Sequence, residues 1–226
     1  PLYIGWRNPR IRGADYEAFI EEFIVAVSER WPDVLLQWED FAGANAAVLL
    51  ERYRDRLCTF DDDIQGTAAV AAGTLLSAIG VTGQPLREQR ICLVGAGAAG
   101  TGIAALLVQA MVEDGLSEAE ARARFYVLDS KGLVAHCLRE VSGERALYAQ
   151  SRETVAGWTL KIPGEIGPYD VMGNAQPTVL IGVSGQAGAF SEEAVREMAR
   201  HVQRPIIFPG DLNSTAGLNG QFVGGP

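Results

Sequence analysis

The sequence predicts an α/β protein in two parts, a Rossmann-like parallel sheet preceded by a smaller, helix-rich α/β part. Two observations predict it. Near the middle of the chain a glycine-rich turn, Gly95–Gly102, separates an apolar strand from a helix, which is the context of a dinucleotide-binding βαβ unit. In the first third, two acidic clusters each follow a short apolar segment: Glu39–Asp40 and Asp61–Asp63.

Composition limits the classes of function. The chain has 226 residues, a net charge of −9 and a sequence pI near 4.8, so the nucleic-acid binders that need a basic surface are excluded. We expect no membrane partner, because no apolar run is judged long and charge-free enough to cross a bilayer. Three cysteines without metal-binding spacing indicate reduced thiols and predict a cytoplasmic setting.

The first part begins with a helix and a strand. Residues 15–30 have helical periodicity, with five apolar side chains on one face: Phe19, Ile20, Phe23, Ile24 and Val27. Trp31–Asp33 ends this helix because Pro32 disfavours helical backbone before it. Residues 34–38 form a short buried strand, which ends at the first acidic pair.

A second helix, an extended piece and a third helix follow. Residues 44–56 predict a helix whose arginines face solvent, and residues 57–60 an extended piece that ends at the three aspartates. Residues 67–79 are uncharged and rich in alanine, so we expect a helix buried on all sides.

The acidic clusters predict a metal site. Three adjacent carboxylates repel one another and, if partly buried, need a cation or hydrogen-bond donors to stay ionised. Oxygen ligands suit a hard divalent ion such as Mg²⁺ or Mn²⁺. The triplet alone is equally consistent with the cap of a helix, but the pair Glu39–Asp40 favours the metal. Successive residues of a strand point to opposite faces, so both acids reach one ion only if the chain turns at this pair, which residues 41–43 permit.

The second part has the order strand, helix, strand. Residues 80–89 predict a domain boundary because they contain Gly83 and Pro85. A strand at 90–94, a helix at 103–114, a segment at 117–124 that extends the crossover, and a strand at 125–128 follow. The strand-to-helix turn and the acid at the end of the second strand predict cofactor binding. Its candidate residues are Gly95, Gly97, Ala98, Ala99, Gly100, Asp129, Ser130 and Lys131.

The acid that follows the second strand leaves the cofactor open. The separation of Gly100 and Asp129 is longer than the usual ~20 residues, which an insertion at 115–120 explains. Asp129 suits the ribose hydroxyls of NAD, whereas Lys131 either attracts the 2′-phosphate of NADP or is simply solvated.

The remaining elements are a short helix at 152–158, a strand at 178–182, a helix at 192–201 capped by Ser191, and a strand at 205–208. Ser184 follows the strand at 178–182, where cofactors lie in open α/β sheets. We divide the chain into a metal and substrate part at residues 1–82, an NAD(P)-binding part at residues 83–209 and an irregular tail at residues 210–226.

Several of these segments together resemble malic enzymes, from about Pro1 to Pro209: Leu36–Phe41, Phe60–Ala68, the Gly95 loop, Asp129–Leu133 and Ile181–Ser184. The resemblance implies that Glu39, Asp40 and Asp63 are metal ligands and that Asp62 is the catalytic carboxylate partnering a lysine. It also assigns cofactor contacts to Gly95, Gly97, Gly100 and Asp129.

The implied reaction is oxidative decarboxylation of L-malate to pyruvate and CO₂ with reduction of NAD⁺ or NADP⁺ and a requirement for Mg²⁺ or Mn²⁺. The resemblance also implies a homo-oligomer, a dimer or tetramer, in which apolar helices such as 19–27 are buried between subunits.

The sequence also departs from the family. Its general acid, a tyrosine, and its general base, a lysine, match no residue here and are expected upstream of Pro1. Asp61 stands where the family usually has Asn, and Asn213 is one position out of register with the family's malate-binding segment. A catalytically incomplete dinucleotide-binding fragment and a malate-to-lactate variant therefore remain as alternatives.

Overall fold

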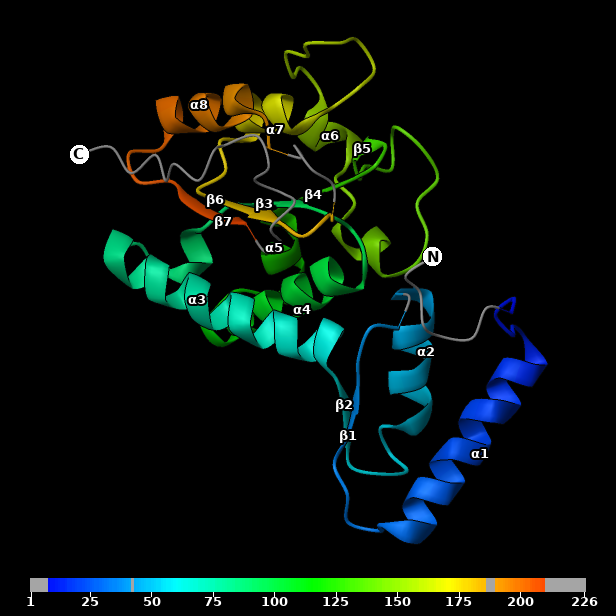
Figure 1. Cartoon of the computed structure of the whole chain (residues 1–226). Coiled ribbons are helices and arrows are strands. Elements are labelled where there is room, and N and C mark those ends of the chain that lie inside the picture. Colours follow the sequence, from blue (N-terminus) through cyan, green and yellow to red (C-terminus); the bar gives the residue numbers. More distant parts are fainter. Residues whose placement is uncertain (1–7, 42, 186–189, 210–226) are drawn as a thin grey trace.

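The computed structural model describes residues 8–41, 43–185 and 190–209 and confirms the predicted α/β fold (Figure 1). A five-stranded sheet has the order β5-β4-β3-β6-β7, and a separate two-stranded sheet pairs β1 with β2. The large sheet consists of β3 (Ile91–Val94), β4 (Phe125–Asp129), β5 (Gly132–Leu133), β6 (Val179–Gly182) and β7 (Ile206–Pro209). All its pairings are parallel except that of β4 with β5.

The strand order places a topological switch point at β3. The chain leaves β3 to form β4 on one side and later returns to form β6 on the other. Ligands of open α/β sheets bind in the crevice at the carboxyl ends of strands where the order reverses in this way. The glycine loop after β3 and Ser184 after β6 therefore lie at this crevice.

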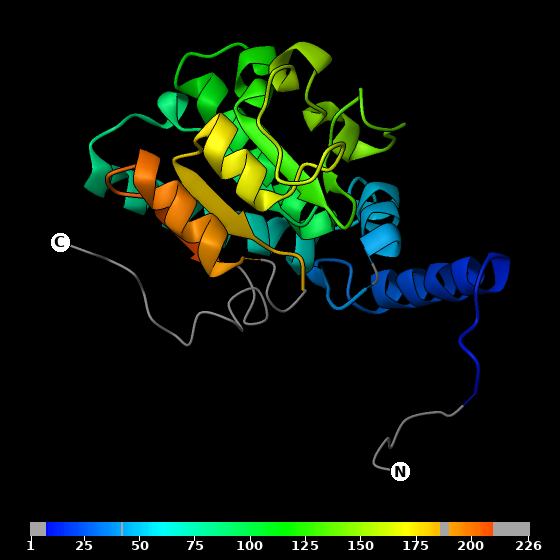
Figure 2. The ribbon, with the colours of Figure 1, turned by 90° about the horizontal axis from the view of Figure 1, so that it is seen from above.

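Helices cover both faces of the large sheet (Figure 2). One face carries α3 (Thr67–Thr82), α4 (Ala98–Glu113) and α5 (Glu118–Ala123), and the other carries α7 (Pro168–Ala175) and α8 (Glu192–His201). Each side has its own hydrophobic cluster. β3 serves both, because Ile91 and Leu93 point into the first cluster and Cys92 into the second, as the alternation of a strand requires.

The helix α3 is not buried on all sides, so that prediction is wrong. Its inner face packs against α4 and the sheet, but Val70 and Val81 are 67% and 73% exposed. The described residues contain one helix, Asp62–Thr82, that is long and apolar enough by length and composition to cross a membrane. This corrects the expectation that no such run exists, although core helices of soluble proteins pass the same test.

The first part of the chain forms a smaller unit beside the sheet (Figure 1). It contains α1 (Ala14–Arg30), β1 (Leu36–Trp38), α2 (Gly43–Tyr53) and β2 (Thr59–Asp61). Ile20 and Ile24 of α1 pack with Trp38 and Tyr53 in a third cluster. Two other residues of the predicted apolar face, Phe19 and Phe23, are 58% and 43% exposed, because no described residue covers them.

Several boundaries differ from the predicted ones. α4 begins at Ala98 rather than residue 103, so its first turn lies directly behind the glycine loop. The short helix α6 (Arg152–Val155) ends three residues early. The helix α7 and the strand β5 were not predicted. A signal for α7 was present, because Pro168 at its first position and Asp170, whose carboxylate accepts from the N–H of Gly167, are helix-start residues.

The division of the chain after residue 82 stays a prediction. The helix α3, which that division assigns to the first part, contributes Ala71, Leu75 and Ile79 to the hydrophobic cluster of the large sheet. The predicted irregular tail, residues 210–226, lies outside the described residues.

Candidate functional site

The two acidic clusters meet because β1 and β2 are parallel neighbours. In their register Trp38 pairs with Asp61, so both strands end at the same edge of the small sheet. The chain continues from β1 into Glu39 and Asp40, and from β2 into a π-helical turn, Asp62–Gly66. Turns of this kind occur often at functional sites. The carboxylates that follow the two strands are thereby brought to one corner.

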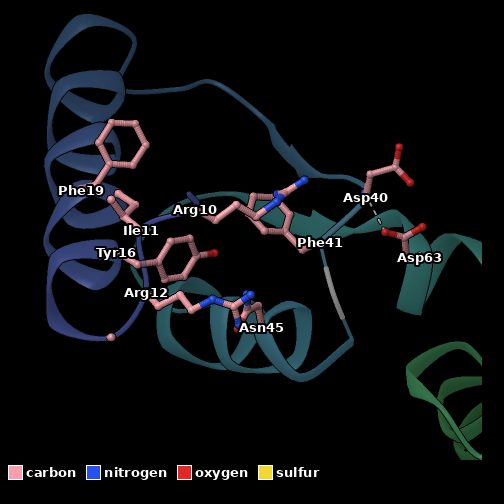
Figure 3. Close-up of a pocket in the computed structure, with 10 residues that line it drawn as sticks. Arg10, Ile11, Arg12, Tyr16, Phe19, Asp40, Phe41, Asn45 and Asp63 are labelled. Atoms are coloured by element: carbon pink, nitrogen blue, oxygen red, sulfur yellow. Dashed lines mark hydrogen bonds between the residues drawn. The ribbon is translucent and has the colours of Figure 1, made fainter. Parts of the chain in front are cut away.

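The corner holds three carboxylates, those of Glu39, Asp40 and Asp63, each with one oxygen within 4.8 Å of the other two. The turn needed to bring Glu39 and Asp40 together occurs at Asp40, whose φ of 59° is left-handed and uncommon outside glycine. The N–H of Asp40 donates to Oδ2 of Asp63 at 2.8 Å (Figure 3). This bond ties the end of β1 to the π-helical turn.

The donor set fits a hard divalent cation. It consists of carboxylate oxygens alone, which are the ligands that Mg²⁺ and Mn²⁺ prefer. Among the described residues, no cationic side chain forms an ion pair with Glu39, Asp40 or Asp63 at 4.0 Å or less. Three negative charges within one corner therefore lack a counter-charge from the described part of the chain.

Gln37 is a further residue at this corner that the sequence reasoning missed. Its Nε2 donates to Oε2 of Glu39 at 2.6 Å, leaving Oε1 of Glu39 for a ligand. Hydrogen bonds of this kind orient a metal-binding carboxylate. The only available signal was its position two residues before Glu39, because residues two apart in extended backbone point to the same face.

The three adjacent aspartates have different surroundings. Asp61 is buried, and its Oδ1 accepts from the N–H of Ile64 at 2.9 Å, so it caps the π-helical turn. Burial raises the pKa of Asp61, and its Oδ2 has no hydrogen-bond partner. Asp62, the predicted catalytic carboxylate, lies against the backbone of Gly66, where an added Cβ would overlap its carboxylate. Asp61 therefore caps the π-helical turn, whereas Asp63 belongs to the group of three carboxylates.

A cavity of about 930 Å³ extends from this corner between α1 and α2. Asp40 and Asp63 line one end (Figure 3). Arg10 and Arg12, from the segment before α1, line it with Tyr16 and Asn45. Both arginines are exposed, and within the described chain neither forms an ion pair. The cavity thus has acidic groups at one end and guanidinium groups elsewhere on its wall, an arrangement that suits an anionic molecule able to chelate a cation.

The second group of candidate residues lies at the carboxyl end of β3. Gly95 has a φ of 121°, and a Cβ there would lie 2.6 Å from the Val183 carbonyl. A Cβ on Gly100 would lie 1.9 Å from the carbonyl oxygen of Gly95. These two positions require glycine, because the loop folds tightly on itself and on the end of β6.

Gly97 differs, because a Cβ there would meet nothing within 4 Å. This open space lies at the N-terminus of α4, where Gly97 is the N-cap and Ala98 and Ala99 form the first turn. Free N–H groups and the helix dipole favour a phosphate there. The residues present therefore fit the pyrophosphate of a dinucleotide, and Ser184, after β6, lies at the same end of the sheet.

Asp129 ends β4, as predicted, but its carboxylate already has protein partners. Oδ1 accepts from Nη2 of Arg139 at 2.7 Å and from the N–H of Lys131 at 2.8 Å. Oδ2 accepts from Nη1 of Arg145 at 3.2 Å. The side chains of Ser130 and Lys131 are exposed. No sequence pattern indicated the two arginines, because they lie 10 and 16 positions downstream in a segment without periodicity.

Two family models match the sequence. One is described as the malic enzyme NAD-binding domain and matches residues 64–214, and the other as the malic enzyme N-terminal domain and matches residues 1–54. Among curated proteins, the NAD-dependent malic enzyme of Edwardsiella ictaluri is 55% identical over 209 residues, and that of Proteus mirabilis is 50% identical. Each alignment covers 92% of this chain but 37% of the relative, so the chain spans little more than a third of those proteins.

Solved structures show the same fold. The NAD-dependent malic enzyme of Thermotoga maritima matches with a TM-score of 0.63 at 22% identity, over 90% of this chain and 51% of that one. The malic enzyme of Entamoeba histolytica matches with a TM-score of 0.62 at 20% identity, over 90% of this chain and 40% of that one.

Proposed function

This chain belongs to the malic enzyme family, and we propose that it takes part in oxidative decarboxylation of L-malate to pyruvate and CO₂ with reduction of NAD⁺ or NADP⁺. The observation that carries the proposal is the convergence of Glu39, Asp40 and Asp63 beside a cavity lined by Arg10 and Arg12. A dicarboxylate that carries a hydroxyl group next to one carboxylate can chelate a cation with those two groups. Its other carboxylate can then bind a guanidinium group. The curated relatives are named NAD-dependent malic enzymes, which supports NAD⁺ as a cofactor.

In this proposal each group of residues has a distinct task. Glu39, Asp40 and Asp63 hold Mg²⁺ or Mn²⁺, which when bound supplies Lewis acidity and a template for the substrate. Gln37 orients Glu39. Asp62 lies next to the ligand Asp63, where it can accept a hydrogen bond from a basic group, as the resemblance implies for the catalytic lysine. We assign no general acid or base, because no residue of this sequence matches those of the family.

The sheet supports the proposed position of the cofactor. Gly97 leaves the approach to the N-terminus of α4 open for the pyrophosphate, and Asp129 marks the position of the adenosine ribose. The nicotinamide carries the hydride chemistry. In this proposal the chain holds cofactor and substrate in fixed positions at the carboxyl ends of parallel strands in its two sheets.

The first experiment measures absorbance of the reduced nicotinamide with L-malate, NAD⁺ or NADP⁺ and Mn²⁺, with and without a chelator. We expect a signal that needs the metal and yields pyruvate. Lactate as the product without net cofactor reduction would instead establish the malate-to-lactate alternative. Cofactor binding without turnover of malate would establish the alternative of an incomplete dinucleotide-binding fragment.

We also propose that the protein self-associates through α1. Phe19 and Phe23 leave apolar surface on that helix, and the neighbouring Ile11 is 55% exposed. We expect sedimentation to detect a dimer or tetramer at micromolar concentration and Phe19→Glu to shift it toward the monomer. A monomeric unsubstituted protein would contradict the proposal.

A further inference from the structure

The carboxylate expected to receive the ribose hydroxyls is largely occupied by the protein itself. A carboxylate offers about four acceptor positions, and Asp129 uses three of them, for Arg139, Arg145 and the N–H of Lys131. Its side chain is 11% exposed, against 21% for Arg139 and 43% for Arg145. Asp129 can therefore accept about one further hydrogen bond, on Oδ2, and Arg145 is the more solvent-accessible of its two cationic partners.

Arg145 lies on the wall of the cavity that contains the glycine loop. This second cavity, of about 460 Å³, is bounded by Gly97, Ala98 and Thr101 at the start of α4 and by Ser142 and Arg145 from the segment after β5. One cavity thus joins the predicted pyrophosphate position to the arginine that holds Asp129. A nucleotide with its pyrophosphate at Gly97 and its ribose near Asp129 brings the ribose 2′ position close to Arg145.

The charges around this position favour an anion. Arg139 and Arg145 more than balance Asp129, and the exposed Lys131 adds a third positive charge nearby. Two acids also line the cavity: Glu51, which pairs with Arg54, and Glu144. Counting all of these groups, the surroundings of Asp129 keep a small excess of positive charge. A site selective for NAD uses a free acid to bind the ribose hydroxyls, whereas a nearby arginine accommodates the 2′-phosphate of NADP.

We propose that Arg145 is a specificity residue that binds the 2′-phosphate of NADP⁺, with Arg139 holding Asp129 in place, so that the site accepts NADP⁺ alongside NAD⁺. This inference rests on the proposed function, because it takes the glycine loop as the cofactor site. It assigns the acceptance of NADP⁺ to the two arginines rather than to Lys131. Arg145 is suited to exchange partners, since it holds Asp129 by one bond of 3.2 Å and is partly exposed.

The test measures dissociation constants for NAD⁺ and NADP⁺ by calorimetry on the unsubstituted protein and on Arg145→Ala. We expect NADP⁺ to bind within about threefold of NAD⁺, and Arg145→Ala to weaken NADP⁺ about tenfold, since a charge-assisted hydrogen bond to phosphate is lost. NAD⁺ should weaken by less than about threefold, because Asp129 keeps Arg139 as a partner. Arg145→Lys should retain part of the affinity for NADP⁺, because it keeps the charge but not the fork of donors.

Two further probes complete the design. Adenosine 2′,5′-bisphosphate should compete with NADP⁺ and inorganic phosphate should not, which separates a nucleotide 2′-phosphate from any bound anion. Arg196→Ala is the matched control, because Arg196 pairs with Glu192 on the exposed face of α8 and should leave both dissociation constants unchanged.

The outcomes separate this inference from the proposed function. The inference alone would be overturned if NAD⁺ bound tightly and the dissociation constant for NADP⁺ were more than about thirtyfold higher, or about 2 kcal/mol. An equal loss of both cofactors in Arg145→Ala would also overturn it, because it would assign Arg145 a structural role. Failure of both cofactors to bind the unsubstituted protein would overturn the proposed function together with the inference.

Discussion

Asp63→Ala is expected to abolish Mn²⁺ binding and leave the affinity for NAD⁺ largely intact. The substitution removes one of three carboxylates in a corner without a counter-cation among the described residues, and it also removes the acceptor of the Asp40 N–H at 2.8 Å. Because that bond supports the left-handed backbone of Asp40, loss of Asp63 also disturbs Asp40, a second proposed ligand. Removing groups that only orient a metal ligand costs about 10- to 100-fold in metal affinity, so losing the ligand itself should exceed about 100-fold.

Asp63→Asn separates charge from geometry. Its amide oxygen can still accept from Asp40, so the corner keeps its shape while one negative charge is lost. Both variants are compared by calorimetry with Mn²⁺ and by thermal unfolding with and without the ion. A metal present at 100 times its dissociation constant stabilises the folded protein by about 2.7 kcal/mol, and we expect both variants to lose this gain.

The matched control is Asp33→Ala, which removes an exposed carboxylate between α1 and β1. It should bind Mn²⁺ like the unsubstituted protein. Unchanged metal affinity in Asp63→Ala would remove Asp63 from the ligand set. Loss of NAD⁺ binding together with metal binding would show that the substitution disrupts the fold rather than the site.

The convergence of Glu39, Asp40 and Asp63 at one corner was accessible from the sequence because strand ends and acidic residues are local patterns. Each acidic cluster follows an apolar segment, and the prediction that the chain must turn after Glu39 corresponds to the positive φ of Asp40. The separate role of Asp61 was not accessible. Whether an aspartate caps a turn or faces a cation depends on which backbone N–H lies within reach, and only the fold brings Ile64 to Asp61.

Two failures of the sequence reasoning have a common physical cause. The helix α3 was expected to be buried on all sides because it is apolar all round. Composition does not show which other elements are present to cover a helix, and Val70 and Val81 are exposed in this chain. The ion pairs of Asp129 with Arg139 and Arg145 depend on the path of an irregular segment. Periodicity gives no information about such a path.

The glycines of the loop should separate into two classes on substitution with alanine. At Gly100 a methyl group would lie 1.9 Å from a backbone carbonyl oxygen that cannot move without shifting β3. We expect Gly100→Ala to lower the free energy of unfolding by about 2–4 kcal/mol, as overpacking against backbone does. Cofactor binding should weaken because less of the protein is folded. Denaturant unfolding measures the change in the free energy of unfolding.

Gly97→Ala should have the opposite profile. Gly97 has an ordinary φ of −84° and open space around the position of a Cβ, so the free energy of unfolding should fall by no more than about 1 kcal/mol, the cost of alanine at an N-cap. The methyl group would occupy the space through which a pyrophosphate approaches the N-terminus of α4. We expect NAD⁺ affinity to fall more than about tenfold, because close approach of phosphate to backbone is lost.

Gly73→Ala provides the control for the substitution itself. Gly73 lies within α3 with nothing near the position of a Cβ, so alanine should stabilise the protein by about 0.5–1 kcal/mol and leave NAD⁺ affinity unchanged. If Gly97→Ala bound NAD⁺ normally, the open space at Gly97 would not be the pyrophosphate position. The N-terminus of α4 would then not hold the phosphates, and the proposed cofactor position would move elsewhere along the carboxyl edge of the sheet.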